Sequence, residues 1–118
     1  MCGICGVFGN GGSESVRAML GVLNHRGPDD EHMVCGPDFA LGARRLSIID
    51  LEHGRQPVTN ETGTVWAVLN GELYNLPELR SQILNRGHKL NSRCDTETLP
   101  HLYEEYMTGL VERIDGMF

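Results

Sequence analysis

The chain starts with an apolar segment in which glycine returns at every third position, C-G-I-C-G-V-F-G over residues 2–9. Apolar residues occupy both sets of alternating positions, as in a strand that is buried on both of its faces. Glycines inside a strand allow another backbone or a ligand to approach closely. The segment therefore predicts a short buried strand, and because glycine interrupts every apolar run, we expect no signal peptide.

Three later segments have the spacing of helices. Ser13 precedes apolar residues at 16, 19, 20 and 23, which predicts a helix from about residue 14 with Ser13 as its N-cap. Asn75 and Glu78 have the spacing of a capping box, and Gly87 would end that helix. A third helix is expected from about Asp95, with apolar residues at 99, 102, 103, 106 and 110.

Further strands are predicted at about residues 32–36, 39–49 and 64–70, the last being rich in β-branched and aromatic residues. The order of one strand, a helix, three strands and two helices lacks the regular alternation of a Rossmann sheet. We therefore expect an α+β fold. With 118 residues, the chain is one domain at most.

Charge and hydropathy exclude several classes of partner. The formal net charge is −6, and acidic and basic residues are interspersed without a basic stripe, so neither nucleic acid nor an anionic membrane is an expected partner. No apolar run reaches the roughly 18 residues that a membrane-spanning helix needs. We expect a cytoplasmic location, in which the four cysteines stay reduced.

Cys2 is the most informative position for chemistry. If Met1 is removed, this residue carries both a thiol and a free α-amine, whose ordinary pKa values are about 8.5 and about 7.7–8.0. The amine could then accept the thiol proton and later deliver it to a leaving group. The alternative is that Cys2 is only a small hydrophobic residue of the strand.

Cys2 and Cys5 also form a C-x-x-C pair, which could be a redox pair or half of a zinc site. A zinc site would need a second close pair of ligands, but Cys35 and Cys94 stand alone and no histidines have H-x₃₋₅-H spacing. The five histidines are scattered in loops or on polar faces. We therefore expect no metal site and assign no histidine a catalytic role.

Three more positions have both a structural and a functional interpretation. Asn70-Gly71 could form a type I′ hairpin turn, or an oxyanion hole made of the Asn70 amide and the Gly71 N–H. Arg45 shares a strand face with apolar residues and needs an anionic partner, which could be a protein carboxylate or a bound amino acid. Asp95 could cap the last helix or hold an ammonium group.

These segments together resemble the class II glutamine amidotransferases, whose glutaminase domains are N-terminal-nucleophile (Ntn) hydrolases. The resemblance covers the whole chain and rests on M-C-G-I-C-G-V-F-G, H-R-G-P-D-D at 25–30, R-R-L-S-I-I-D at 44–50, N-G-E-L-Y-N at 70–75 and C-D-T-E at 94–97. The third and fourth motifs favour the asparagine synthetase branch. A related amidotransferase of cell-envelope biosynthesis remains an alternative.

The resemblance implies a role for each matching residue. Cys2 would be the nucleophile that forms a thioester with glutamine, and its α-amine would be the base. Asn70 and Gly71 would form the oxyanion hole. The substrate-binding residues implied in the same way are Arg45 for the α-carboxylate, Glu72 and Asp95 for the α-amino end, and Ile48 and Ile49, whose backbone would shape the pocket.

The resemblance also implies a fold and partners. The fold would be an Ntn-hydrolase αββα sandwich with antiparallel sheets, present only in part because we expect the domain to be incomplete at its C-terminus. No cofactor is expected in this chain; ATP and magnesium would belong to a C-terminal synthetase domain that receives the ammonia and is absent from these residues. A homodimer is a further expectation. The alternative is a non-catalytic glutamine-binding or pairing module.

Overall fold

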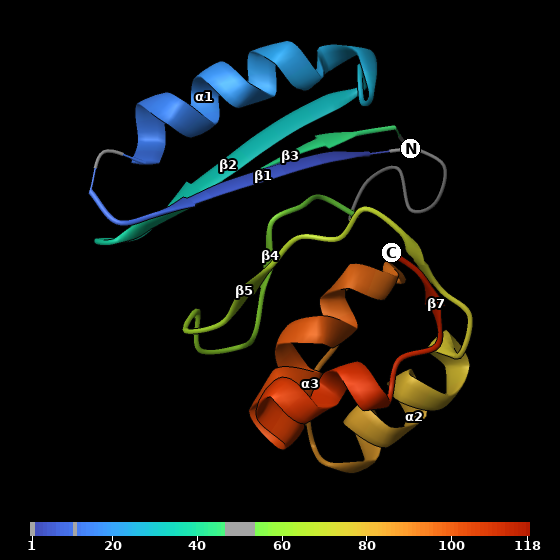
Figure 1. Ribbon diagram of the computed structural model, residues 1–118. Helices are drawn as coiled ribbons and strands as arrows, with labels where there is room; N and C mark the ends of the chain where they lie inside the picture. Colours follow the sequence, from blue (N-terminus) through green and yellow to red (C-terminus); the bar gives the residue numbers. More distant parts are fainter. Residues whose placement is uncertain (1, 11, 47–53) are drawn as a thin grey trace.

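The computed structural model describes residues 2–10, 12–46 and 54–118. In Figure 1, α1 covers one face of the sheet formed by β1, β2 and β3, and α2 and α3 lie together in a second layer beyond the other face. The strands are β1 (Gly3–Phe8), β2 (Asp30–Cys35), β3 (Phe39–Arg45), β4 (Val58–Thr59), β5 (Trp66–Ala67), β6 (Glu72–Leu73) and β7 (Gly116–Met117). The helices are α1 (Gly12–Val22), α2 (Leu76–Asn85) and α3 (Thr98–Tyr106), with 3₁₀ turns η1 (Leu23–His25), η2 (Asp95–Glu97) and η3 (Met107–Glu112).

The first sheet has the strand order β1-β3-β2, and both pairings are antiparallel. The predicted strands at 2–9, 32–36 and 39–49 are confirmed in position, although residues 47–53 lie outside the described part of the chain. The expectation that the first strand is buried on both faces is wrong for the described residues. Ile4 is 39% and Phe8 82% exposed, because α1 covers only the opposite face.

Helix α1 packs on that opposite face through Val16 and Leu20, which are 0% and 1% exposed. A Cβ at Gly42 would come within 2.8 Å of Val16 and 2.9 Å of Leu20, so glycine lets the helix approach β3 closely. The helix begins at Gly12, and Ser13 therefore lies inside it rather than at its N-cap. The predicted helix is confirmed, but its predicted cap is not.

The second layer is held by a hydrophobic core between α2, α3 and the segment before them. Its buried residues are Leu69, Leu73, Leu79, Ile83 and Leu102, none of which is more than 8% exposed. Burying a leucine or isoleucine side chain fully contributes about 1.5–3 kcal/mol, so this core is the main stabilising feature of the layer.

Asn75 marks the start of α2, as predicted, but its side chain does not cap the helix. The Asn75 Nδ2 donates a hydrogen bond to the Arg113 carbonyl at 2.8 Å, and Oδ1 accepts one from the Asp115 N–H at 3.0 Å. The Tyr74 N–H also donates to the Asp115 carbonyl at 2.7 Å. The predicted capping box is therefore wrong, since Asn75 instead ties the start of α2 to residues about 40 positions later.

The observed elements confirm a mixed α+β fold with small antiparallel sheets. The predicted strand at 64–70 is reduced to β5, which pairs with β4. The last helix starts at Thr98, after the η2 turn, rather than at Asp95. Across the described ranges, none of the helices has the length and apolar character required to span a membrane.

Candidate active site

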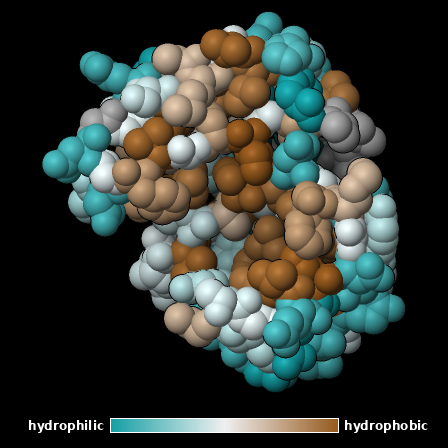
Figure 2. Space-filling view, viewed as in Figure 1, coloured by the Kyte–Doolittle hydropathy of each residue, from teal (hydrophilic) through white to brown (hydrophobic). Residues whose placement is uncertain are grey.

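A pocket of about 210 Å³ lies between the end of the first sheet and the second layer. In the space-filling view of Figure 2, hydrophobic side chains gather along this junction and the surface is hollowed beside them. The pocket brings together every described residue among the predicted site residues, whereas Ile48 and Ile49 lie outside the described residues. Its lining consists of Cys2, Arg45, Leu46, Gln56, Leu69, Asn70, Gly71, Glu72, Cys94, Asp95 and Met117.

Cys2 and Cys5 lie on opposite sides of the first sheet. Cys2 lines the pocket, whereas Cys5 packs under α1 and its Sγ donates to the carbonyl of Val16 at 3.9 Å. Burial, together with the charge of Glu31, raises the pKa of the Cys5 thiol and makes it a poorer nucleophile. All four cysteines are free. This geometry opposes the redox and zinc interpretations of the C-x-x-C pair, because the two thiols cannot meet across the sheet.

The two arginines at the end of β3 also separate by face. Arg44 lies on the α1 side, where its Nε donates to the Leu20 carbonyl at 3.0 Å and its guanidinium pairs with Glu31. Arg45 lies on the other side, lines the pocket and is 7% exposed. The alternation of β3 therefore directs one buried cation toward the same space as Cys2.

The H-R-G-P-D-D loop positions the ends of both strands. Gly27 lies against the Arg44–Arg45 peptide so closely that a Cβ there would be 2.4 Å from the Arg44 carbonyl carbon. The Arg26 Nε donates to the Cys2 carbonyl at 3.3 Å, and the Asp29 N–H donates to the Arg45 carbonyl at 3.1 Å. Sequence reasoning matched this motif without assigning it a role, and the structure shows that it holds Cys2 and Arg45.

Asn70-Gly71 does not form a hairpin turn. The strands on either side have different partners, since β5 pairs with β4 and β6 pairs with β7. A type I′ turn needs positive φ at both central residues, and neither Asn70 nor Gly71 has it. Gly71 has a steric reason to be glycine, because a Cβ would be 2.2 Å from the Met117 carbonyl oxygen. Its backbone therefore lies open to the pocket on one side and against β7 on the other.

Asp95 does not cap α3, which begins three residues later. One of its oxygens accepts a hydrogen bond from the Leu73 N–H at 3.1 Å, and the other accepts from the Thr96 N–H at 2.8 Å. These bonds fix the carboxylate at the pocket wall, beside the exposed Glu72 of β6. The pocket therefore has two carboxylates, Glu72 on β6 and Asp95 in the η2 turn, and a cation, Arg45, on β3.

Gln56 is a lining residue that sequence reasoning missed. It is 8% exposed, and its Oε1 accepts a hydrogen bond from the Leu69 N–H at 2.7 Å. This bond holds the backbone just before Asn70. A single glutamine in a polar loop carries no pattern, so no local signal could have found it.

The arrangement can bind a small zwitterion and attack it with a thiol. Arg45 offers a cation for a carboxylate, Asp95 and Glu72 offer anions for an ammonium group, and Cys2 offers a nucleophile. Potential metal ligands occur elsewhere: Glu61, His88, His101 and Glu104 form a separate cluster, and none of them lines this pocket.

Comparison with known proteins places the chain in one family. The glutamine amidotransferase domain matches residues 1–118, and the chain belongs to this family. Its curated relatives include glutamine-hydrolysing asparagine synthetase 1 of Bacillus subtilis, which is 38% identical over 125 residues. The glutamine-hydrolysing asparagine synthetases of Zea mays and, as isoform 1, of Arabidopsis thaliana are 39% and 38% identical over 123 residues. All of this chain is aligned, yet it spans only about a fifth of each relative, 20%, 21% and 21% respectively.

Proposed function

We propose that this chain hydrolyses the side-chain amide of glutamine to glutamate and ammonia, with Cys2 as the nucleophile. The observation that carries the proposal is the shared pocket, in which Cys2 lies with Asn70 and Gly71. The family membership and the similarity to glutamine-hydrolysing enzymes support it.

The reaction would proceed through a thioester. After Met1 is removed, the α-amine of Cys2 takes the thiol proton, and the sulfur attacks the amide carbon of glutamine. The Asn70 side-chain amide and the Gly71 N–H donate to the developing oxyanion, where such donors contribute most. Ammonia leaves with the proton from the α-ammonium group, and water then cleaves the thioester to release glutamate and restore the Cys2 thiol.

Charge complementarity would orient the substrate in the pocket. The α-carboxylate of glutamine would pair with Arg45, and its α-ammonium group would pair with Asp95 and Glu72. These groups sit on separate elements, β3, the turn at η2 and β6. The substrate would therefore bridge the first sheet and the second layer, with the backbone of Ile48 and Ile49 as a further proposed wall.

The ammonia would pass to an ATP-dependent, magnesium-requiring synthetase domain for asparagine synthesis in the cytoplasm. Support for asparagine synthesis as the destination comes from the names of the relatives. The chain itself spans only about a fifth of their length. The fold proposed for the whole domain is the Ntn-hydrolase αββα sandwich. A glutaminase that serves a related envelope-biosynthesis enzyme is the second candidate, and the sequence motifs favour the synthetase branch over it.

The test compares Cys2→Ala with Cys5→Ala, a matched thiol removed from the opposite side of the sheet. Glutamate and ammonia are measured together after incubation with glutamine. We expect the unmodified chain and Cys5→Ala to release glutamate and ammonia in equal amounts, and Cys2→Ala to release neither. Equal loss in both variants, with the fold retained by circular dichroism, would contradict Cys2 as the nucleophile, and binding of glutamine without products would indicate the non-catalytic module.

A further inference from the structure

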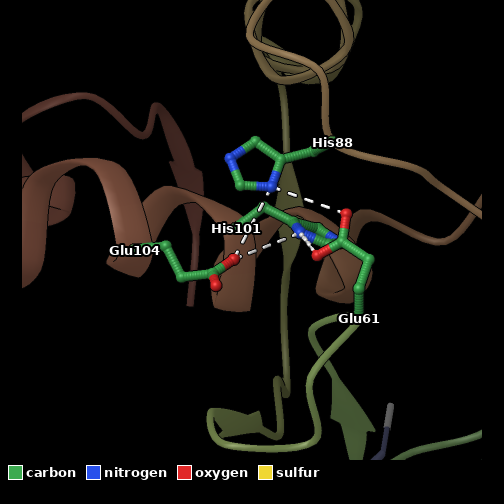
Figure 3. Close-up of side chains that lie close together, drawn as sticks. All are labelled: Glu61, His88, His101 and Glu104. Carbon is green, nitrogen blue, oxygen red and sulfur yellow. Dashed lines mark ion pairs between the residues drawn. The ribbon is translucent and has the colours of Figure 1, made fainter.

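Two histidines and two glutamates from three separate segments converge at the outer end of the second layer. Figure 3 shows Glu61 from the β4–β5 connection, His88 from the segment after α2, and His101 and Glu104 from α3. The ligand atoms of the four side chains all lie within 4.8 Å of one another. Neither the histidines nor the glutamates have sequence spacing that marks a metal site, and the sequence alone therefore predicts none here.

His101 is the residue whose surroundings most need explanation. It is 1% exposed, which corrects the expectation that it lies on a polar face. Neither of its ring nitrogens has a hydrogen-bond partner among the described residues. Its Nδ1 nevertheless lies 3.3 Å from the Glu61 Oε2 and 3.7 Å from the Glu104 Oε2. In the neutral tautomer that carries its proton on Nε2, the Nδ1 that faces these two carboxylates has a lone pair available for a cation.

Hydrogen bonds also position the other three side chains. His88 Nε2 lies 2.9 Å from the Glu105 Oε1, and a proton on Nε2 leaves the Nδ1 lone pair facing the cluster. The Asn60 amide donates to Glu104 at 2.8 Å, and the Lys89 N–H donates to Glu61 at 2.7 Å.

Four distances between these side chains are close to the edges of a tetrahedral centre. Zinc bonds of 2.0–2.2 Å to nitrogen and oxygen imply ligand-to-ligand edges of about 3.3–3.6 Å. His88 Nδ1 lies 3.5 Å from Glu61 Oε1 and 3.6 Å from Glu104 Oε2. His101 Nδ1 lies 3.3 Å from Glu61 Oε2 and 3.7 Å from the same Glu104 oxygen, so the two histidines face different oxygens of Glu61. We propose that Glu61, His88, His101 and Glu104 form a closed, structural site for a divalent transition cation, with zinc as the expected ion.

The proposed ion would be structural because all four positions are taken by protein side chains. Imidazole and carboxylate ligands suit zinc, and two carboxylates balance its charge. The Glu105 that orients His88 also pairs with Arg86, which supplies the outer hydrogen bonding that metal-binding histidines usually have. The site would tie the β4–β5 connection to α2 and α3, and it is separate from the proposed glutaminase chemistry.

The test titrates zinc into the 118-residue chain after treatment with chelator, using calorimetry. One ion per chain is expected, with affinity lowered at least about 100-fold in His88→Asn and Glu61→Gln, and about 10–100-fold in Glu105→Gln, which only orients a ligand. His25→Asn is the matched control, because His25 is exposed, its Nδ1 bonds to the Val22 carbonyl, and it lies outside the four-residue cluster. Glu61→Gln keeps the test decisive if His88→Asn fails to fold.

Cobalt(II) serves as a spectroscopic probe that separates this site from the thiols. A tetrahedral visible spectrum without sulfur-to-cobalt charge transfer is expected, and it should persist in Cys2→Ala. Charge transfer from sulfur, loss of binding in Cys2→Ala, or unchanged zinc affinity in both His88→Asn and Glu61→Gln would overturn the proposed site. None of these readouts depends on glutamine hydrolysis, so the two proposals fail independently.

Discussion

Gly27→Ala tests whether the loop at residues 25–30 positions the pocket residues. This glycine lies against the backbone of Arg44 and Arg45, so an added Cβ would displace the loop. The added Cβ would lie 2.4 Å from the Arg44 carbonyl carbon and 2.5 Å from the Arg45 nitrogen. Ordinary van der Waals contacts begin near 3.4 Å, so the loop must move by about 1 Å. The atoms it meets are backbone atoms in a paired strand, and β3 cannot move aside as a flexible side chain could.

The displaced loop would lose two hydrogen bonds, from Arg26 to the Cys2 carbonyl and from Asp29 to the Arg45 carbonyl. A neutral hydrogen bond contributes about 0.5–1.5 kcal/mol and one with a charged donor about 1.5–3 kcal/mol. Since Arg26 is partly exposed, we expect the free energy of unfolding to fall by about 2–3 kcal/mol. A misplacement of 1 Å at reacting groups costs about 100-fold in rate, so glutamine hydrolysis should fall by that factor.

Urea unfolding and glutamate release measure the two effects, and Gly21→Ala is the matched control. A Cβ at Gly21 meets nothing within 4 Å, and the position lies inside α1. Alanine there should raise stability by about 0.5–1 kcal/mol and leave hydrolysis unchanged. If Gly27→Ala unfolds at the same urea concentration as the unmodified chain and hydrolyses glutamine as fast, the loop does not position Cys2 and this reasoning is refuted.

Four other changes test the proposed roles and the core. Asn70→Ala should lower kcat about 10²–10³-fold with a smaller change in KM, whereas Arg45→Ala should mainly raise KM; the reverse pattern in steady-state kinetics would exchange their roles. Protein that retains Met1, as read by intact mass, should be inactive, and activity in such a sample would exclude the Cys2 α-amine as the base. Leu102→Ala, at a position that is 0% exposed, should reduce the free energy of unfolding by about 2–5 kcal/mol; a reduction below 1 kcal/mol in urea would show that the core can close the cavity.

Local patterns predicted the parts of the fold that depend on neighbours in sequence. The strands at about 32–36 and 39–49 and the first two helices lie close to their predicted positions. The helical spacing of α1 included Val16 and Leu20, which are buried, but also Met19, which is 39% exposed. Cys2, Arg45 and Asn70 were named in advance because their motifs resemble a known family, and the pocket brings them together.

Contacts between distant segments could not be predicted in this way. Asn75 was expected to cap its own helix, but its partners lie in residues 113–115. Asn70-Gly71 has the local signal of a hairpin, which the pairing of β6 with β7 overrides. His101 is buried, and two of the side chains beside it, Glu61 and His88, come from segments outside its own helix. In each case, the deciding partner is invisible to a short sequence window.

The pairing of β6 with β7 has a consequence for synthesis on the ribosome. Met117 closes over Gly71 and also lines the pocket, so the pocket is built from residues at both ends of the described chain. At a translation rate of about 5–20 residues per second, roughly 6–23 s pass between the synthesis of Cys2 and that of Met117. A growing chain therefore carries the Cys2 thiol without the complete pocket around it, and the lining residue that is made first is enclosed only after the one made last.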